Sequence, residues 1–594
     1  MTNKPYYLTI LSLFFAAAVN AQSLTVSGGT VSLANNTMLY TPGLSVTSGT
    51  FECAGHLIID GSLTGSANID LASTANLDLR QDAEFVFSDD ASFWALDLAN
   101  TARVIVQPGK SIELEGSIVH NSSENIELRA DATNGYSMLK NSGPYSGSGT
   151  GRVMQQQNLN AGWIMIAAPM TNTTAGFFGD VGATGPGHTV NTQNLFSWDG
   201  SNYVNVVDNN STITPGRGYF GFVGQYGFRG TVGVHDFTGV PNLSVSPSLN
   251  FATAGNDVVI EGDPTATEGW NLIANPFTCA LDFSLLTRTN VDNAFYVFNN
   301  SKSGGAGYES YASGGISHPE IAPLQSFWVK ASAASPSLGT LSMATHGTTS
   351  ASPNHLRTVS FDRLVLRTHV AQDTAINDYT VVSFVDDNTT MGYDGAWDAY
   401  KMANTGSIPN IYSTHSDGAA MAINAIPYGP GYSDKMTVPI SFRASQQGES
   451  FRISFDDSYM LNTYAVYLED KLEKTFTDLN AQDYSFVNDT SMSARFVLHF
   501  RAGALSIDEP ESLSRTNTGL HAWIFAGQAH INSRIAGDVQ LSVFDMSGKQ
   551  LQSGQMNVSA GGRYEWPLRQ DLAAGVYLLR IHTSLGTQSI KFNK

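Results

Sequence analysis

The feature that most restricts the fold of this chain is a period-two pattern of short apolar–polar–apolar triplets, repeated almost from end to end. Residues 77–79, 112–114 and 126–128 are examples, and Gly, Asn and Ser separate one triplet from the next. A period of two is typical of a strand that buries one face, and each triplet is long enough for one short strand. Helical periodicity is almost absent. The sequence therefore predicts an all-β protein, and a length of 594 residues indicates about four domains.

Residues 22–150 contain triplets that recur at steps of about eight residues, as at 96, 104 and 112. This pattern favours a β-solenoid-like region, in which each strand stacks on its copy in the next coil. An antiparallel sandwich is the alternative, and the spacing is too irregular to give a coil length.

Residues 151–355 carry an internal repeat, with copies at about 151–256 and 257–355. The segment GWIMIAAP at 162–169 matches GWNLIANP at 269–276, at an offset of 107 residues. Further along, residues 213–220 match residues 321–328 at an offset of 108. An aromatic segment lies between these two landmarks in each copy, at 195–198 and at 295–298. Because three landmarks keep their order, we predict a duplicated β module.

Aromatic residues are concentrated in both copies of the repeat, at 195–198 in the first and 295–298 in the second. Trp163 and Trp270 each precede an alternating strand, and a Pro ends that strand. We expect both indoles to lie in a core, because a buried indole removes a large apolar surface from water. The alternative is that these aromatic side chains line a sugar-binding face.

The remaining chain divides into a β-sandwich, a linker and a second small sandwich. Residues 356–504 alternate in period two, with one short helix predicted at 395–402. The stretch LSIDEPESLSRTNT at 505–518 has the composition of a linker. Residues 519–594 contain about seven short strands, which is typical of a small Ig-like β-sandwich.

The N-terminus has the form of a secretory signal peptide over residues 1–21. Lys4 supplies the positive charge, residues 6–18 are nearly all apolar, and Ala21 precedes the expected cleavage point. The apolar run is shorter than the roughly 20 residues that a membrane-spanning helix needs. We therefore expect an exported chain with no transmembrane span.

The net charge limits the classes of binding partner, and the cysteine spacing bears on disulfides and metal sites. The net charge of −20 argues against nucleic acid and anionic lipid as partners. Cys53 and Cys279 match neither a disulfide framework nor a metal site. We interpret them as two buried thiols, with a long-range bridge as the alternative.

The C-terminal segment resembles the sorting domain of type IX secretion substrates in Bacteroidota. The resemblance rests on VFDMSGK at 543–549, LAAGVYLLRI at 572–581 and KFNK at 591–594. Domains of this family end in a Gly-Val-Tyr strand, a Gly-containing hairpin and a basic final strand. The Tyr-Pro-Asn-Pro element with which many of them begin is missing here. The residues that would carry the sorting signal are Gly548, Lys549, Gly575, Val576, Tyr577, Gly586, Lys591, Phe592 and Lys594.

The resemblance implies recognition by the outer-membrane translocon and sortase of type IX secretion. It implies trimming near the linker, with attachment to an anionic surface polysaccharide or release, and so a cell-surface or extracellular location. Residues 269–276, 393–402 and 466–471 are also similar to segments of large secreted Bacteroidota proteins, which implies a stalk or spacer.

No catalytic motif stands out in the sequence. HExxH, GxSxG and phosphate-binding glycine loops are missing, and the 13 His are scattered. Asp386, Asp387, Asp394 and Asp398 are calcium candidates, although caps and solvated loop carboxylates explain them as well. We predict a non-enzymatic, adhesin-like or spacer protein without a catalytic cofactor. The alternatives are a secreted carbohydrate-binding or carbohydrate-active protein and an enzyme without a known motif.

Overall fold

The structure is a computed structural model of the chain, and it confirms the all-β fold class with a solenoid-like region. It describes residues 8–9, 23–179, 181, 194–224, 232–252, 260, 267–315, 320–332, 339–344, 348–349, 362–385, 392–415, 417–427, 437–456, 464–488, 494–502, 520–525, 528–533, 535–559, 562–569, 571–573 and 575–593. The predicted linker and most of the predicted signal peptide lie outside these residues. No helix among the described residues is long and apolar enough to cross a membrane.

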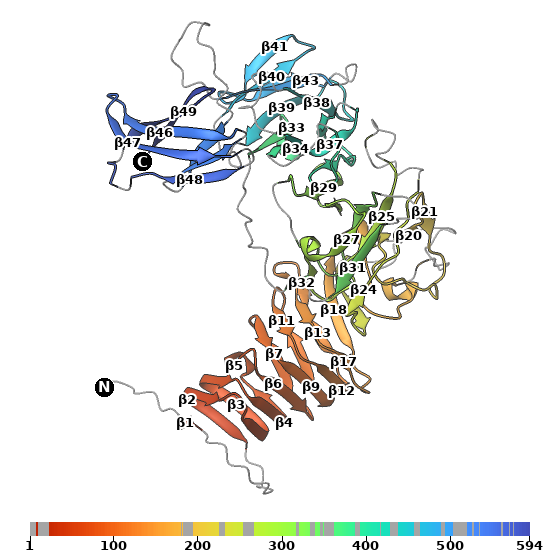
Figure 1. The fold of residues 1–594 in the computed structure, drawn as a ribbon. Coiled ribbons are helices and arrows are strands. Elements are labelled where there is room, and N and C mark those ends of the chain that lie inside the picture. Colours follow the sequence, from red (N-terminus) through yellow and green to blue (C-terminus); the bar gives the residue numbers. More distant parts are fainter. Residues whose placement is uncertain are drawn as a thin grey trace. The chain divides into compact units, whose positions relative to one another are not determined.

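The N-terminal region is a three-sided parallel β-solenoid (Figure 1). One side consists of β1 (Leu8–Thr9), β2 (Leu24–Leu33), β3 (Met38–Cys53), β4 (His56–Thr64), β5 (Ile69–Leu71), β6 (Asn76–Arg80), β9 (Ala95–Asn100), β12 (Ile118–Ser122) and β17 (Tyr145–Ser146). The second side consists of β7 (Glu84–Phe87), β10 (Arg103–Val106), β13 (Ile126–Leu128) and β18 (Val153–Leu159), and the third of β8 (Ala91–Phe93), β11 (Ser111–Leu114) and β16 (Met138–Asn141). The short elements η1 (Ser66–Asn68), β14 (Ala130–Asp131) and β15 (Gly135–Tyr136) lie in the turns between the sides.

Coil length in the solenoid follows from strand register. Leu57, Leu77, Leu96 and Ile118 stack in one column, at steps of 20, 19 and 22 residues, and the last step to Tyr145 is 27. The triplets at 96, 104 and 112 lie in β9, β10 and β11, which are three successive sides of one coil. The eight-residue step is therefore the length of one side, and the stacked copy of each strand comes about three steps later.

The solenoid core is a column of aliphatic and aromatic side chains from all three sides. Leu57, Leu77, Leu96 and Ile118 are fully buried in it, and each such burial contributes about 2 kcal/mol relative to exposure. The last coil extends past residue 150, because β18 pairs in parallel with β13. On its other edge, β18 pairs antiparallel with β23 (Gly233–Gly239). β18 is therefore the last parallel strand on this side of the solenoid.

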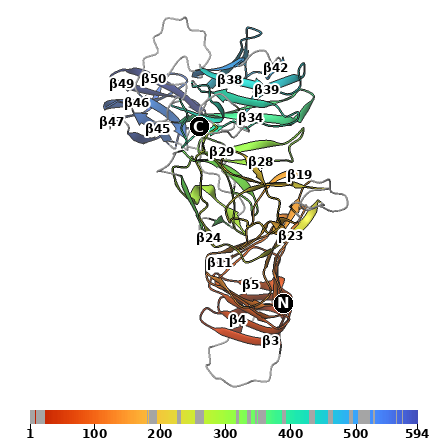
Figure 2. The same ribbon diagram turned by 90° about the vertical axis from the view of Figure 1, so that its right-hand side faces the viewer.

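The duplicated region contains two four-stranded antiparallel sheets with the same strand order. Strands of both sheets are labelled in Figure 2. The first sheet has the order β19 (Gly162–Ile166), β22 (Tyr219–Val223), β20 (Leu195–Trp198), β21 (Tyr203–Asn205). The second has the order β25 (Trp270–Ala274), β30 (Ser326–Lys330), β28 (Ala294–Asn299), β29 (Gly307–Ala312). All three sequence landmarks of the repeat therefore fall on equivalent strands. Smaller elements complete the region: η2 (Ala175–Phe178), β24 (Ser244–Val245), β26 (Ala280–Leu281), η3 (Phe283–Leu285), β27 (Thr287–Thr289), β31 (Thr340–Ala344) and β32 (Thr348–Thr349).

The contacts between the two copies include equivalent pairs. In such a pair, the residues 107 or 108 positions away from those of one contact make the same contact in the reverse direction. Ile166 bridges to Gln325, and the equivalent Ile273 bridges to Arg217. The backbone hydrogen bonds follow the same rule. The N–H of Ala167 donates to the carbonyl of Leu324 (2.8 Å), and the N–H of Ala274 donates to the carbonyl of Gly216 (2.9 Å). Such reciprocal contacts are the mark of a two-fold interface, so the copies form a pseudo-dimer within one chain.

The third β unit, residues 362–502, is one continuous eleven-stranded sheet that folds back on itself. Its order is β41 (Thr475–Asp478), β40 (Tyr464–Asp470), β43 (Phe496–Ala502), β38 (Thr437–Arg443), β36 (Asn410–Thr414), β37 (Ala420–Pro427), β34 (Asp373–Val385), β33 (Arg363–Val370), β39 (Ser450–Asp456), β42 (Tyr484–Val487), with β35 (Ala399–Tyr400) paired to β37. Phe442 of β38 contacts Phe451 of β39 and Phe486 of β42, with ring centroids 4.8 and 4.9 Å apart. Strands far apart in the sheet order therefore face each other.

The helix predicted at 395–402 is wrong. The N–H groups of Trp397 and Asp398 both donate to the carbonyl of Asp394, which closes a single turn, and β35 begins at Ala399. Pairing of Ala399 with Ile423 in β37 outweighs the weak local helical preference of this short segment.

The C-terminal module, residues 520–593, consists of two antiparallel sheets. The first has the order β44 (Leu520–Phe525), β45 (Gln528–Ser533), β48 (Arg563–Pro567). The second has the order β47 (Gln550–Val558), β46 (Gly537–Asp545), β49 (Val576–Thr583), β50 (Gly586–Asn593). One hydrophobic cluster fills the space between the sheets, and all its members belong to this module, among them Ile531, Leu541, Leu579 and Ile581.

Candidate functional site

Most of the predicted sorting residues gather at one end of the C-terminal module. Asp545 at the end of β46 lies opposite Tyr577 at the start of β49, and Tyr577 lies opposite Phe592 in β50. Gly548 and Lys549 follow in the turn between β46 and β47. Three separate stretches of sequence thus meet here. We call this the turn end, and it comprises residues 545–549, 575–577 and 591–593.

The turn at 545–549 is held by the side chain of Asp545. Its carboxylate accepts the N–H groups of Ser547 (2.9 Å) and Lys549 (3.0 Å) and the hydroxyl of Ser547 (2.6 Å). The Ser547 hydroxyl and these N–H groups lower the pKa of Asp545 below its usual value, because they stabilise the charged form. Gly548 adopts φ +84°, a left-handed conformation that Gly takes without strain. The sequence Asp-Met-Ser-Gly therefore specifies this turn.

Tyr577 and Phe592 are core residues of the turn end rather than surface groups. Both side chains are buried, and their ring centroids lie 5.6 Å apart. The Tyr577 hydroxyl donates to the carbonyl of Ala573 (2.6 Å), which ties the segment before β49 to the sheet. Gly575 lies against the same ring. The Gly-Val-Tyr motif thus fixes how the chain enters β49.

Two predicted sorting residues are not part of the turn end. Gly586 is the first residue of β50, at the opposite end of the sheet from Gly575, and Lys594 lies outside the described residues. Lys591 pairs with Leu578 in the β49–β50 ladder, within the turn end. The sequence motif therefore combines residues of both ends of the module.

Sequence reasoning missed one residue of the turn end. Met546, at the tip of the 545–549 turn, is 69% exposed, among the highest values for a large hydrophobic side chain in the described residues. A large apolar residue inside a turn motif that otherwise holds polar residues and Gly was the available signal.

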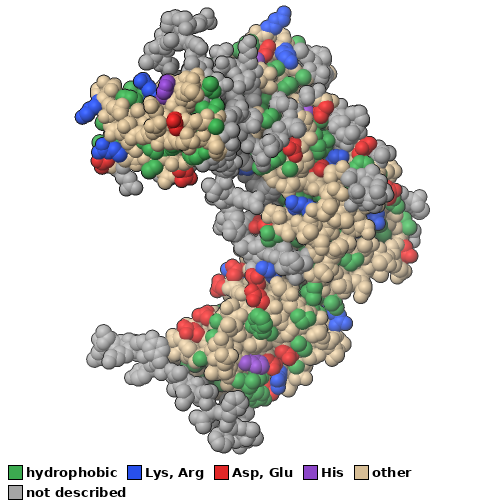
Figure 3. All heavy atoms as spheres, viewed as in Figure 1, with side chains coloured by type: hydrophobic (Ala, Val, Ile, Leu, Met, Phe, Trp, Pro, Cys, Tyr) green, Lys and Arg blue, Asp and Glu red, His purple; other side chains and the backbone are tan. Residues whose placement is uncertain are grey.

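The C-terminal residues also differ in charge from the rest of the chain. Residues 519–594 contain 7 Lys and Arg against 4 Asp and Glu, a net charge of +3, whereas residues 1–518 contain 24 against 47, a net charge of −23. Figure 3 shows Lys and Arg side chains on the C-terminal module and Asp and Glu side chains over the solenoid. Partners that recognise only this module therefore meet a basic surface on an otherwise acidic protein.

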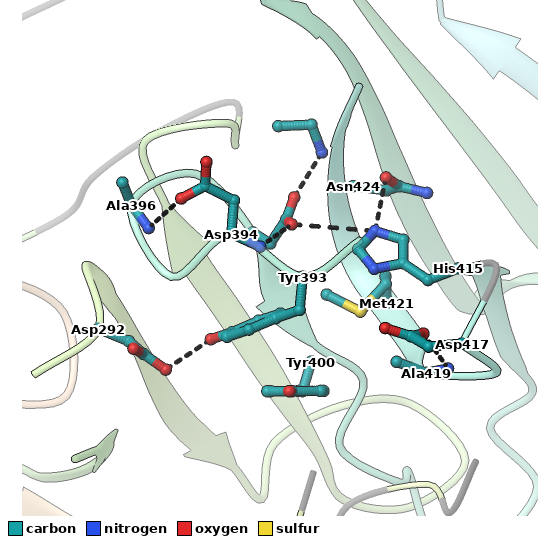
Figure 4. Close-up of polar contacts among 12 residues, drawn as sticks. Asp292, Tyr393, Asp394, Ala396, Tyr400, His415, Asp417, Ala419, Met421 and Asn424 are labelled. Carbon is teal, nitrogen blue, oxygen red and sulfur yellow. Dashed lines mark hydrogen bonds and ion pairs between the residues drawn. The ribbon is translucent and has the colours of Figure 1, made fainter. Parts of the chain in front are cut away.

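A second cluster of titratable side chains lies between the second repeat copy and the third β unit (Figure 4). Tyr393 stacks on Tyr400 at 4.2 Å and donates its hydroxyl to Asp292 of the second copy (2.6 Å). Lys330 reaches over the ring of Tyr400 at 5.7 Å. Burial raises the pKa of Asp292 and of Tyr393. These contacts join the two units through buried polar groups.

Asp398 lies at the centre of this cluster, with its side chain fully buried. Its Oδ1 accepts the N–H of Ala425 (2.6 Å), its Oδ2 accepts the N–H of Asp394 (2.7 Å), and Nε2 of His415 lies 3.8 Å from Oδ2. Burial raises the pKa of Asp398 to about 8, although both N–H groups favour the charged form. His415 also contacts Oδ1 of Asn424 at 2.9 Å.

These contacts do not support calcium binding at Asp398, because both of its oxygens are already used by backbone donors. Asp386 and Asp387 lie outside the described residues. Asp394 uses Oδ1 to accept the N–H of Ala396 (3.0 Å). Among the residues that the structure describes, no three His, Cys, Asp or Glu side chains are placed to hold a metal ion.

A buried ion pair supports the third β unit from within. Nζ of Lys401 lies 2.6 Å from Oδ2 of Asp378, and both side chains are 3% exposed. The same oxygen accepts the N–H of Ile411 (2.9 Å). Burial lowers the pKa of Lys401, and its neighbour Asp378 opposes that shift.

The two cysteines are both buried and unbridged. Cys53 belongs to the solenoid core and Cys279 to the core of the second copy. Burial raises the pKa of the Cys53 thiol to about 11, which makes it a poor nucleophile at neutral pH. The interpretation as buried thiols is confirmed, and the long-range bridge is wrong.

The two repeat tryptophans lie in different environments. Trp270 is buried in a cluster that also includes Tyr296, Trp328 and Tyr400. Trp163, its equivalent, is only partly buried and stacks on Phe220, with ring centroids 5.0 Å apart. The prediction of a core position is confirmed for Trp270, whose ring also lies 6.3 Å from that of Tyr400 in the third β unit, whereas Trp163 is only partly buried.

Comparisons with known proteins add little to this description. A protein-family model described as "Domain of unknown function (DUF8693)" matches residues 354–500, which include most of the third β unit. No curated protein matches the sequence. Among solved structures, dimeric latent PorU from Porphyromonas gingivalis aligns at 11% identity, over 43% of this chain and 31% of that chain, with a TM-score of 0.12. The alignment thus spans about a third of the PorU chain.

Proposed function

We propose that this chain is an exported, non-enzymatic surface or extracellular protein, adhesin-like or a spacer, whose C-terminal module is its address for type IX secretion. The observation that carries the proposal is the construction of that module. It closes its own hydrophobic cluster and brings three motif stretches to one end. A sorting signal read in the folded state needs both properties. The expected signal peptide at residues 1–21 would provide the first step of export.

The rest of the chain has the properties of a scaffold. The β18–β23 pairing joins the solenoid to the first copy, and bridges such as Ile166–Gln325 join the two copies. Buried polar contacts such as Tyr393–Asp292 join the second copy to the third β unit. The titratable groups that the fold gathers around Asp398 are buried and occupied by structural hydrogen bonds. They give no reason to assign a reaction to this cluster.

The export claim is tested by truncating the chain after Thr518 in a bacterium with a type IX secretion system. We expect the full chain at the cell surface or in the medium and the truncated chain in the periplasm. A strain without the outer-membrane translocon is the control, and there both chains should stay in the periplasm. Equal export of both chains from the parent strain would refute the assignment.

The adhesin-like or spacer role is tested separately by deleting the gene. We expect reduced attachment or altered surface structure, because a β scaffold on the surface serves contact or spacing. Unchanged attachment, surface structure and biofilm in the deletion strain would count against this role while leaving the export claim intact.

A second candidate function, carbohydrate binding, is favoured by the environment of Trp163. Its indole lies 5.7 Å from the ring of Phe196 and 5.4 Å from that of Phe222, and all three side chains are partly exposed. Partly exposed aromatic rings are suited to stacking against the apolar faces of sugars. Binding on a glycan array that Trp163→Ala abolishes would support this function, and an array without signal would dismiss it.

A further inference from the structure

We propose that the turn end of the C-terminal module is the surface that its partner recognises, and that this partner presents an apolar pocket rimmed by acidic groups. The inference rests on the proposed function and specifies its partner. It also separates the predicted sorting residues into two classes, because Gly586 lies at the other end of the module.

The first argument is that Met546 is exposed on a turn, residues 545–549, whose conformation is fixed before binding. Three hydrogen bonds to Asp545 fix the backbone of this turn, and Gly548, two residues after Met546, has the left-handed conformation. An exposed apolar side chain on a fixed turn loses little conformational freedom on binding. Methionine also adapts its shape to an apolar pocket.

The second argument is the charge around Met546. Lys549 is exposed in the same turn. Arg569, which follows β48, donates Nη1–H to the carbonyl of Leu551 (3.0 Å), and the guanidinium of Arg580 lies 5.1 Å from the ring centroid of Phe544. Two carboxylates lie nearby: Asp545 accepts hydrogen bonds within its own turn, and Oδ1 of Asp571 accepts Nε–H of Arg569 (2.9 Å). Three cations against two carboxylates leave a net positive charge near the apolar tip, and acidic groups on the partner complement it.

The opposite end of the module differs in these respects and serves as a matched control. Leu585, at the tip of the β49–β50 turn, is 53% exposed. It lies in the half of the module that also contains the exposed acidic residue Asp538, whose Oδ1 accepts Nδ2–H of Asn557 (2.8 Å). Arg563, the first residue of β48, also lies at this end. Each end therefore presents one large apolar side chain at a turn tip, but only the 545–549 turn carries a basic residue, Lys549, beside that side chain, whereas residues 583–586 contain no charged residue.

The experiment compares four full-length variants in a bacterium with a type IX secretion system. Met546→Ser and Lys549→Gln change the turn end. Leu585→Ser and Ser584→Glu change the opposite end, and they match the first pair in apolar area removed and in charge. We expect each turn-end variant to lose at least about fivefold in exported protein, as for a contact residue at the centre of an interface. The opposite-end variants should stay within about twofold of the parent chain.

One further variant and one further measurement exclude unfolding as the cause. Lys549→Arg keeps the charge and should restore export. Resistance of the periplasmic Met546→Ser chain to limited proteolysis should equal that of the parent, because the side chain packs against nothing in the core. Normal export of both turn-end variants, or equal loss at both ends, would overturn the inference. Export of the chain truncated after Thr518 would instead overturn the proposed function.

Discussion

Asp398 should make the third β unit more stable in mild acid than at slightly alkaline pH. Its carboxyl group is fully buried beside Asp394 and His415, and burial raises its pKa to about 8, while an unfolded chain has an Asp pKa of about 3.9. Between these values the folded chain holds a proton that the unfolded chain has released. The free energy of unfolding therefore falls as the pH rises through this window.

The expected size follows from the linkage relation. Each pH unit inside the window changes the free energy of unfolding by up to about 1.4 kcal/mol, so the step from about pH 5.5 to about pH 7.5 should cost roughly 3 kcal/mol. The whole window corresponds to a cost on the order of 5 kcal/mol. The loss should be complete somewhat above pH 8, where both states are ionised.

The assay is hydrogen exchange of peptides from residues 410–427 at both pH values, corrected for intrinsic exchange rates. We expect Asp398→Asn to remove most of the pH dependence, because an amide does not titrate, even though its own hydrogen bonds lower the absolute stability. Asp417→Asn is the matched control, since it removes the same charge from an exposed neighbour on the next loop. The same pH slope in Asp398→Asn and in the parent chain would refute the reasoning.

Three further predictions concern stability. Trp270→Ala should lower the free energy of unfolding by about 3–5 kcal/mol, because its indole is buried, and the equivalent Trp163→Ala by no more than about 2 kcal/mol. Both values are measured by urea unfolding, and equal losses would contradict the difference in burial. Gly395→Ala should lower the melting temperature by overpacking worth about 1–3 kcal/mol, because its Cβ would lie 2.4 Å from Oδ1 of Asp292, and an unchanged melting curve would argue against this contact. Lys401→Met should lower the free energy of unfolding by about 3–5 kcal/mol at neutral pH, because it leaves the buried Asp378 carboxylate without its counter-charge, and an unchanged free energy in urea unfolding would contradict this.

The repeat shows how far sequence comparison reaches. The matching segments at 162–169 and 269–276 predicted two equivalent sheets, and β19 and β25 occupy equivalent positions in them. The same comparison predicted a core position for both Trp163 and Trp270. It could not separate them, because the residues that cover Trp270 belong to another domain, at about residue 400.

The solenoid gives a similar lesson about spacing. The steps between residues 96, 104 and 112 were visible, but the sequence did not distinguish the side of a coil from a whole coil. Stacking of Leu96 on Leu77 and Ile118 decides this, and such parallel pairing is a contact between residues about 20 positions apart.

The sequence by itself determined the strand class, the repeat and the turn at 545–549, because each depends on side chains within a few residues of one another. Period-two alternation, Gly at a left-handed position and an Asp that caps its own turn are local properties. The tertiary structure alone decided which aromatic face is covered, why Asp398 holds its proton and which motif residues share one end of the C-terminal module. These depend on register and burial between distant segments, and neither the desolvation of a carboxyl group nor the meeting of three strand ends is encoded in local spacing.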